Sequence, residues 1–218
     1  MDGIRPLIEF FVTGGPFMLP ILVVFAVGTA IAVERYVTLS LERKRNRNAW
    51  SKFQPALDAG EFDKARELTS HDDSAIAQVL ALGLARQGAV RRREDIEIAM
   101  EEGMMEIIPQ LEKRTPYLAL AANIATLLGL LGTIMGLIQA FTAVSEANPA
   151  EKADLLSAAI SVAMNTTAFG LLVAIPLLIT HTVVTTKTSQ IVAGLEMASV
   201  KTLNAIQSTV KRQFQVAA

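Results

Sequence analysis

Two threonines, Thr133 and Thr167, are the residues of this sequence best suited to handle an ion. Each stands in a long uncharged stretch among small residues that recur every three or four positions, so each set occupies one face of a helix. A hydroxyl both donates and accepts hydrogen bonds, and two hydroxyls facing one lumen could pass an ion or water along. Beside them, we expect a set of small residues to line the pore: Gly129, Gly136, Ala140, Ala163, Gly170 and Ala174.

Tight packing between helices explains the same pattern. Inside a membrane, small residues let two backbones approach closely, while large apolar residues face lipid. The two interpretations are compatible, because a helix at a subunit boundary can pack on one flank and line a lumen on the other. The opposite faces carry leucines that we expect to contact lipid: Leu127, Leu130, Leu131, Leu137, Leu171, Leu172 and Leu178.

Charged residues are missing where a proton pathway would need one. A protein that conducts protons by protonation normally holds a titratable group at membrane depth. His181 is the one candidate, but it precedes Lys187 by six residues, which is roughly 9 Å of helix. We favour an interfacial histidine over a proton relay, and we expect the titrating carboxylate to come from another polypeptide.

The sequence predicts no metal site, cofactor or catalytic centre. It contains no cysteine, and the neighbours His71, Asp72 and Asp73 cannot all face one ion. The sequence shows no cluster of a nucleophile, a base or metal ligands at membrane depth or in the loop. We therefore expect no enzymatic activity. A net charge of −1 gives no indication of a nucleic-acid partner.

Composition and charge distribution indicate a membrane protein. Hydrophobic residues make up 51% of the chain, the mean hydropathy is +0.39, and the charges concentrate between residues 34 and 114. Three stretches nearly free of charge are long enough to cross a hydrocarbon core of roughly 30 Å. We therefore predict an all-α fold, an integral membrane protein with three transmembrane helices that extend into a cytoplasmic helical bundle. A short link makes the second and third helices an antiparallel hairpin.

The region between the first two stretches is predicted to form short helices joined by turns. Ser74 is a plausible N-cap after the turn at 71–74, and a helix is expected over 92–112, kinked at Pro109. Thr115 and Pro116 resemble an N-cap and a first-turn proline for the second membrane helix.

The third membrane helix is expected to continue past Lys187, because apolar residues there repeat at helical spacing. They are Val192, Leu195, Leu203, Ile206 and Val210. This stripe either packs on the helix over 92–112, in the same or a neighbouring subunit, or lies on the membrane surface.

Basic residues near the ends of the stretches predict the orientation. They concentrate after the first stretch, before the second and after the third, which places those sides in the cytoplasm and the N-terminus outside. The predicted segments are a periplasmic N-terminal segment 1–15, transmembrane helix 16–38, cytoplasmic helical region 39–114, transmembrane helix 115–145, periplasmic loop 146–154, transmembrane helix 155–186 and cytoplasmic C-terminal helix 187–218.

Two signatures in these stretches resemble the MotA/TolQ/ExbB proton-channel family. Residues 128–141, which begin Leu-Gly-Leu-Leu-Gly-Thr, are similar to the second-helix signature of the family, and residues 165–176 are similar to the third-helix signature. Gly15, Met18, Pro20 and the Glu34-Arg35 pair resemble its first-helix pattern. The three-span layout resembles the ExbB and TolQ members.

The resemblance implies a homo-oligomer, with a pentamer expected, around a single-span partner of the ExbD/TolR/MotB type that supplies a membrane aspartate. Thr133 and Thr167 match the two pore threonines of the family. Two positions depart from the pattern: Val162 stands where many relatives have glutamate, and Thr126 stands where a proline is common. A glutamate-based relay therefore does not transfer to this chain.

The predicted function is the channel-forming subunit of a proton- or sodium-driven motor in the bacterial inner membrane, energising outer-membrane transport or envelope maintenance. The alternative is a non-conducting membrane scaffold that organises partners through its cytoplasmic bundle. Both hypotheses place the chain among membrane lipids as a multi-pass protein.

Overall fold

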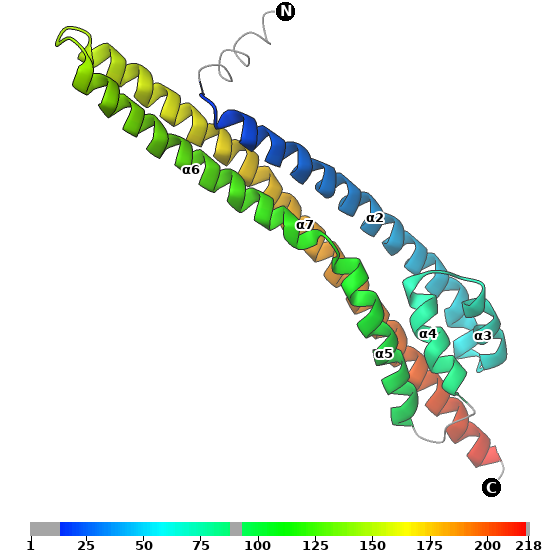
Figure 1. The fold of residues 1–218 in the computed structure, drawn as a ribbon. Helices are drawn as coiled ribbons and strands as arrows, with labels where there is room; N and C mark the ends of the chain where they lie inside the picture. Colours follow the sequence, from blue (N-terminus) through cyan, green and yellow to red (C-terminus); the bar gives the residue numbers. More distant parts are fainter. Residues whose placement is uncertain (1–13, 88–92, 217–218) are drawn as a thin grey trace, which may run out of the picture. The chain divides into compact units, whose positions relative to one another are not determined.

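The structure, a computed structural model, describes residues 14–87 and 93–216, and these residues are helical with short connections. The helices are α2 (Met18–Asp58), α3 (Phe62–Ser70), α4 (Ala75–Arg86), α5 (Arg93–Glu112), α6 (Thr115–Glu146) and α7 (Lys152–Val216), as Figure 1 shows. No β-strand occurs in the described ranges. The predicted all-α fold is therefore confirmed, whereas most of the predicted N-terminal segment 1–15 lies outside the described residues.

Three helical stretches are long and apolar enough to cross a membrane, as the sequence predicts. They are Met18–Asp58, Arg93–Glu146 and Lys152–Thr209. The chain divides into two compact units, and α2 and α7 contribute to both. We call residues 14–35 and 114–183 the span unit, and residues 36–87, 93–113 and 184–216 the bundle unit.

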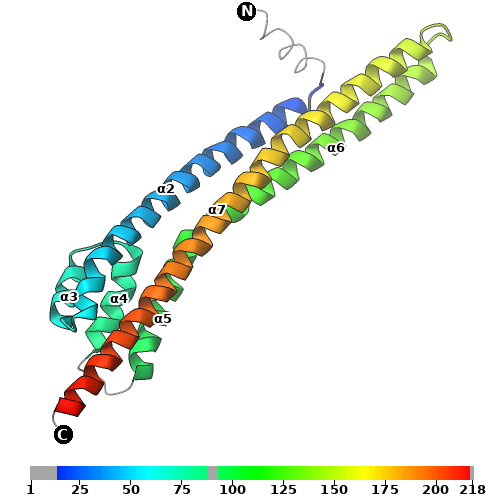
Figure 2. The same cartoon turned by 180° about the vertical axis from the view of Figure 1, so that it is seen from behind.

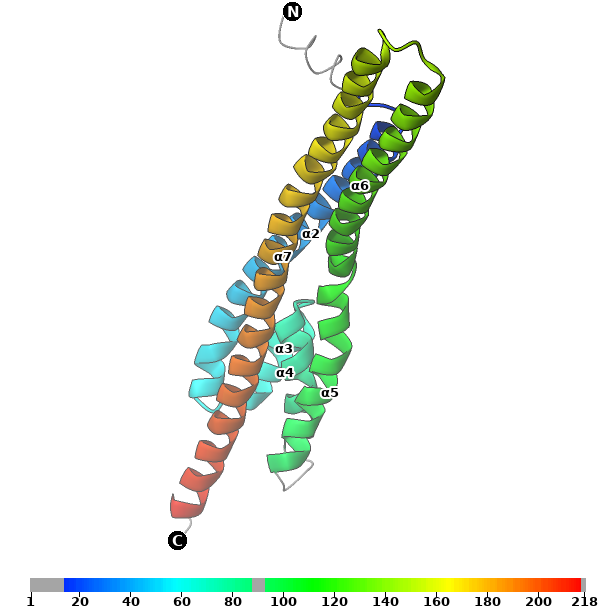
Figure 3. The same ribbon diagram turned by 90° about the vertical axis from the view of Figure 1, so that its left-hand side faces the viewer.

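In the span unit, α6 and the first part of α7 lie side by side and antiparallel (Figures 1 and 3). The first part of α2 lies along α7 (Figures 1 and 2), and a methyl group added to Gly28 would come within 2.9 Å of the Leu177 side chain. Ile21, Leu118 and Val173 are fully buried in this unit. Their burial removes apolar surface from the surroundings, whereas the other faces of these helices still present apolar side chains outward.

Glycines bring the backbones of α6 and α7 into direct contact. A methyl group added to Gly170 would lie 2.7 Å from the carbonyl oxygen of Ala125 and 3.0 Å from the Cα of Gly129. Seven residues, or about two turns, after Gly129 on α6, a methyl on Gly136 would lie 3.0 Å from the Ala163 Cβ. Any larger residue would therefore separate the helices, which is why small side chains recur at this contact.

In the bundle unit, α3, α4 and α5 pack together (Figure 3). A methyl added to Gly83 of α4 would lie 2.6 Å from the Met100 side chain of α5, and Ile96 and Leu111 of α5 are buried. The hydroxyl of Ser74 accepts a hydrogen bond from the Ala77 N–H at 3.4 Å, which confirms the predicted N-cap.

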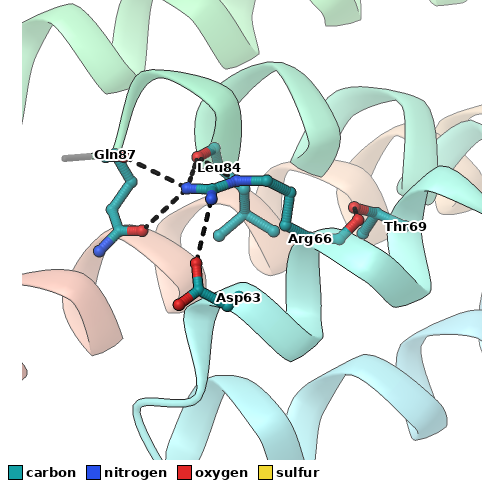
Figure 4. A network of polar contacts seen from close by, with 5 residues as sticks. All are labelled: Asp63, Arg66, Thr69, Leu84 and Gln87. Carbon is teal, nitrogen blue, oxygen red and sulfur yellow. Dashed lines mark hydrogen bonds and ion pairs between the residues drawn. The ribbon is translucent and has the colours of Figure 1, made fainter. Parts of the chain in front are cut away.

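Arg66 of α3 links α3 to the C-terminal end of α4 through hydrogen bonds (Figure 4). Its guanidinium donates to the carbonyl oxygen of Leu84 at 2.9 Å and to that of Gln87 at 3.3 Å, and it pairs with Asp63 at 3.1 Å. The last carbonyls of a helix have no partner within the helix. A cation placed on them satisfies those acceptors and interacts favourably with the negative end of the helix dipole.

The predicted C-terminal stripe packs inside the bundle unit. Leu195, Leu203 and Ile206 are all buried there, in agreement with the packing interpretation and not with a membrane-surface helix. The side chain of Val210 lies outside the described residues.

The prediction that Thr115 caps α6 is wrong. Thr115 is the first helical residue, and the cap is Arg114, whose φ of 65° places it in the left-handed region. Pro116 lies in the first turn as expected, where a missing N–H costs nothing. Helix α5 continues through Pro109 and ends at Glu112, and the turn between α5 and α6 lies at residues 113–114.

The backbone contact at Gly170 predicts that Gly170→Ala lowers stability, because the added methyl meets a carbonyl oxygen that cannot move aside easily. We expect a loss of about 1–3 kcal/mol in the free energy of unfolding, measured in detergent by thermal or denaturant unfolding. The matched control is Gly194→Ala in the same helix, where the new methyl meets nothing within 4 Å. That variant should gain about 0.5–1 kcal/mol from helix propensity. Equal effects of the two substitutions would contradict the packing account.

Candidate functional site

The candidate site lies along the contact between α6 and α7 in the span unit. Gly129, Gly136, Ala163 and Gly170 form that contact within one chain. Ala140 and Ala174, the two remaining small residues predicted to line a pore, are buried in the same unit. Within a single chain these small residues let α6 and α7 pack closely, as the packing interpretation predicts. Whether their flank also faces a lumen between chains stays a prediction.

Thr167 spans the contact between the two helices. Its hydroxyl donates a hydrogen bond of 2.8 Å to the carbonyl oxygen of Gly129 on α6, across 38 residues of sequence. A methyl on Gly129 would lie 3.3 Å from the Cα of Thr167, so the absence of a side chain at Gly129 permits this approach. The close approach at Gly129 and the hydrogen bond of Thr167 therefore join α6 and α7 at the same level.

Thr133 lies one turn of α6 beyond Gly129 and is partly exposed. Its hydroxyl donates a hydrogen bond of 2.6 Å to the carbonyl oxygen of Leu130, within its own helix. Carbonyl oxygens only accept, so the hydroxyl protons of Thr133 and Thr167 are both engaged. What each hydroxyl still offers is its oxygen lone pairs. The structure thus presents two acceptors within about one helical turn, roughly 6 Å of rise.

Thr166 is a functional candidate that the sequence reasoning did not single out. It is 1% exposed, and its hydroxyl lies 2.5 Å from the carbonyl oxygen of Gly14 and 3.0 Å from that of Val162. A methyl on Gly132 would overlap the Thr166 Cγ2, so this glycine makes room for the buried threonine. The signal in the sequence was the pairing of a threonine next to Thr167 with a second glycine three residues after Gly129.

Val162 packs beside the segment that enters α2. A methyl on Gly15 would lie 3.2 Å from its Cγ1, and Gly15 adopts a φ of 76° that favours glycine. The apolar side chain suits this half-buried position. Val162 is therefore part of the internal packing of the span unit.

Charges flank the site but do not enter it. Residues 17–33, 115–145 and 155–180 contain no acidic, basic or histidine residue. At one end of the span unit, Arg114 pairs with Glu34 at 3.0 Å, and Arg35 is buried. His181 is partly exposed toward the end of the unit. No group of three potential metal ligands occurs among the described residues, those around His71 included.

Known proteins resemble this chain in sequence. The MotA/TolQ/ExbB proton channel family matches residues 71–197. The chain is 30% identical over 195 residues to the putative biopolymer transport protein ExbB-like 1 of Synechocystis, covering 84% of this chain and 72% of that protein.

Two shorter matches have higher identity. The chain is 40% identical over 78 residues to the Tol-Pal system protein TolQ of Haemophilus influenzae, covering 36% of this chain and 34% of TolQ. It is 46% identical over 59 residues to the biopolymer transport protein exbB1 of Vibrio cholerae, covering 27% of this chain and 26% of that protein. These two alignments therefore span about a third or less of each relative.

The hydrogen bond between helices predicts different stabilities for two equivalent substitutions. Thr167→Val removes the bond to Gly129 and should lower the free energy of unfolding by about 0.5–1.5 kcal/mol. Thr133→Val removes a bond within one helix turn and should change stability by less than about 0.5 kcal/mol. Unfolding in detergent measures both, with Thr167→Ser as the variant that keeps the hydroxyl. A larger loss of unfolding free energy in Thr133→Val than in Thr167→Val would contradict the assignment of the bond between the helices to Thr167.

Proposed function

Because this chain belongs to the MotA/TolQ/ExbB proton channel family, we propose that it forms the ion pathway of a motor complex in the bacterial inner membrane. Copies of the chain, five in our proposal, surround a single-span partner of the ExbD/TolR/MotB type. Passage of a proton or sodium ion between them drives mechanical work, such as energising outer-membrane transport or maintaining the envelope. The chain has no catalytic role in this proposal.

One observation carries the proposal: residues 17–33, 115–145 and 155–180 offer hydroxyl oxygens as acceptors but contain no acidic, basic or histidine residue. The donors of Thr133 and Thr167 are engaged by carbonyl oxygens, and the spans hold no carboxylate of their own. A protonated carboxyl is a donor and needs an acceptor inside the membrane. The two sets of groups are complementary, so the acid belongs on the partner helix.

The proposed cycle follows from the cost of charge inside a membrane. An ionised carboxylate is expensive there, and it stays where water or a cation can solvate it. Once protonated, the partner's aspartate is neutral and donates its proton in a hydrogen bond to the oxygen of Thr167 or Thr133. A sodium ion would be held by the same lone pairs together with the carboxylate. Release on the other side restores the charge, and the partner turns relative to the surrounding chains.

The backbone contact between α6 and α7 supports this role mechanically. A wall against which a second helix turns must keep its acceptors in place, and packed interiors resist deformation. Gly129 and Gly170 hold the two helices at contact distance, and Thr167 bonds across them at the same level. The acceptor oxygen is thereby fixed by both helices at once.

The charge pattern supports an N-terminus in the periplasm and a C-terminus in the cytoplasm. Basic residues follow the first span in α2 and the last span in α7, which is the side that remains in the cytoplasm. In this orientation the bundle unit is cytoplasmic.

A non-conducting scaffold remains the second candidate, and the size of the bundle unit favours it. Three helices and the ends of two others build a packed unit with its own buried core. As a scaffold, the protein would tolerate polar-to-apolar changes at both threonines and lose function when the bundle unit is altered.

Ion flux through the complex with its partner tests the proposal. We expect Thr167→Val to reduce flux in proteoliposomes by about 10-fold or more, because the variant offers no oxygen to the partner's carboxyl. Thr167→Ser keeps the acceptor and should retain most of the flux. Native mass spectrometry should find the same subunit composition for both variants.

The control for a general packing defect is Gly136→Ala, which perturbs the same contact without touching a hydroxyl. This variant should conduct better than Thr167→Val. Full flux in a correctly assembled Thr167→Val complex would overturn the ion-pathway role and favour the scaffold. Flux by this chain without any partner would overturn the assignment of the acid to a second polypeptide.

A further inference from the structure

A groove between α2 and α7 in the bundle unit has no role in the ion pathway. It encloses a cavity of about 220 Å³. Arg43, Arg47 and Trp50 of α2 line it on one side, and Gly194, Leu195 and Met197 of α7 line it on the other. Its lining is mostly apolar and includes two exposed arginines, Arg43 and Arg47, so it suits an apolar side chain flanked by carboxylates.

Asn46 adds an unused donor to this groove. Its side chain is 9% exposed and lines the cavity, and its Oδ1 accepts a hydrogen bond of 3.1 Å from the N–H of Ile76. That N–H can only donate, which identifies the oxygen and leaves the Nδ2 group without a partner among the described residues. A buried donor left unpaired is costly, so it points to an acceptor brought by a ligand.

The size of the cavity favours a protein segment. Pockets for small molecules usually measure about 300–1,000 Å³, whereas this one holds one or two large side chains. Helices commonly bind such grooves by one face, with apolar residues as anchors at helical spacing.

The same unit exposes a helix face with the matching chemistry. On α5, Glu94, Ile98, Glu101 and Met105 follow one another at intervals of four, three and four residues and all point outward. Ile98 is 59% exposed and Met105 is 73% exposed, although both are large and apolar. Among the described residues, Glu101 and its neighbour Glu102 have no ion pair within 4 Å.

We propose that this face of α5 docks into the α2–α7 groove of the adjacent copy of the chain. The proposal rests on the ring of subunits in the proposed function and adds the contact that closes it. Ile98 and Met105 fill the cavity, the acidic residues between them meet Arg43 and Arg47, and an α5 side chain accepts from Asn46.

The dimensions of the two surfaces agree. Ile98 and Met105 are seven residues apart, and so are Arg43 and Trp50 on one wall of the groove and Gln190 and Met197 on the other. Seven residues of helix measure about 10.5 Å. The anchors and the groove are thus equally long.

The face of α5 and the groove are two different surfaces of the same chain. A contact between two different surfaces of identical subunits closes a ring when the rotation from one subunit to the next closes.

Engineered cysteines test this contact cleanly, because the chain has none of its own. One tagged chain carries Met105→Cys and a second, differently tagged chain carries Met197→Cys, and both are expressed together with the partner protein. Oxidation with copper phenanthroline should link the two tags into a disulfide dimer. The control replaces Met105→Cys by Ser70→Cys, on the exposed surface of α3, and should give no linked dimer.

Charge reversal tests the electrostatic part of the contact. Arg43→Glu with Arg47→Glu in the Met197→Cys chain should lower the yield of the linked dimer by about 10-fold, because like charges then face each other. Glu101→Arg with Glu102→Arg in the Met105→Cys chain should restore it. Arg45→Glu, at a residue of α2 that does not line this groove, is the matched control and should leave the yield unchanged.

The outcome separates this inference from the proposed function. A ring that conducts ions but gives no Met105–Met197 link, or no more than the Ser70 control, overturns the docking contact and leaves the ion pathway standing. A link from Met197→Cys to a different polypeptide in an intact ring also overturns it, since another protein then occupies the groove. A link in a ring that conducts no ions supports the contact and counts against the ion pathway alone.

Discussion

The direct backbone contact between α6 and α7 is the constraint on which the site depends. Gly170 and Gly129 bring the helices together so closely that an added methyl would meet backbone atoms. Only at that separation can the hydroxyl of Thr167 reach the carbonyl oxygen of Gly129. The bond engages the hydroxyl proton and leaves the oxygen as an acceptor, so packing decides the chemistry that the residue can offer.

In the proposed function, the chemistry is divided between two polypeptides. A membrane span that kept its own carboxylate would have to solvate it in every state of the cycle. The spans of this chain offer hydroxyl oxygens as fixed acceptors, and the apolar side chain of Val162 packs against Gly15. In the proposed motor, the charge that changes is carried by the helix that moves, while the surrounding wall remains rigid and uncharged.

The sequence predicted what periodicity and charge determine: the three apolar helices, the apolar stripe in the last part of α7 and the N-cap at Ser74. It could not decide between packing and pore lining at the small residues, because both produce the same spacing. The distances at Gly129 and Gly170 show the packing in one chain. The cap at Arg114 was missed because a left-handed arginine has no sequence signal, and the roles of Thr166 and Asn46 depend on neighbours distant in sequence.

A structure of the chain assembled with its single-span partner tests the central claim most directly. The account predicts that the oxygen of Thr167 or Thr133 lies within about 2.6–3.2 Å of the partner's membrane carboxyl, with the flank of the small residues facing the partner. An assembly in which both threonines face acyl chains, or in which bulky side chains of this protein fill the central axis, would contradict it.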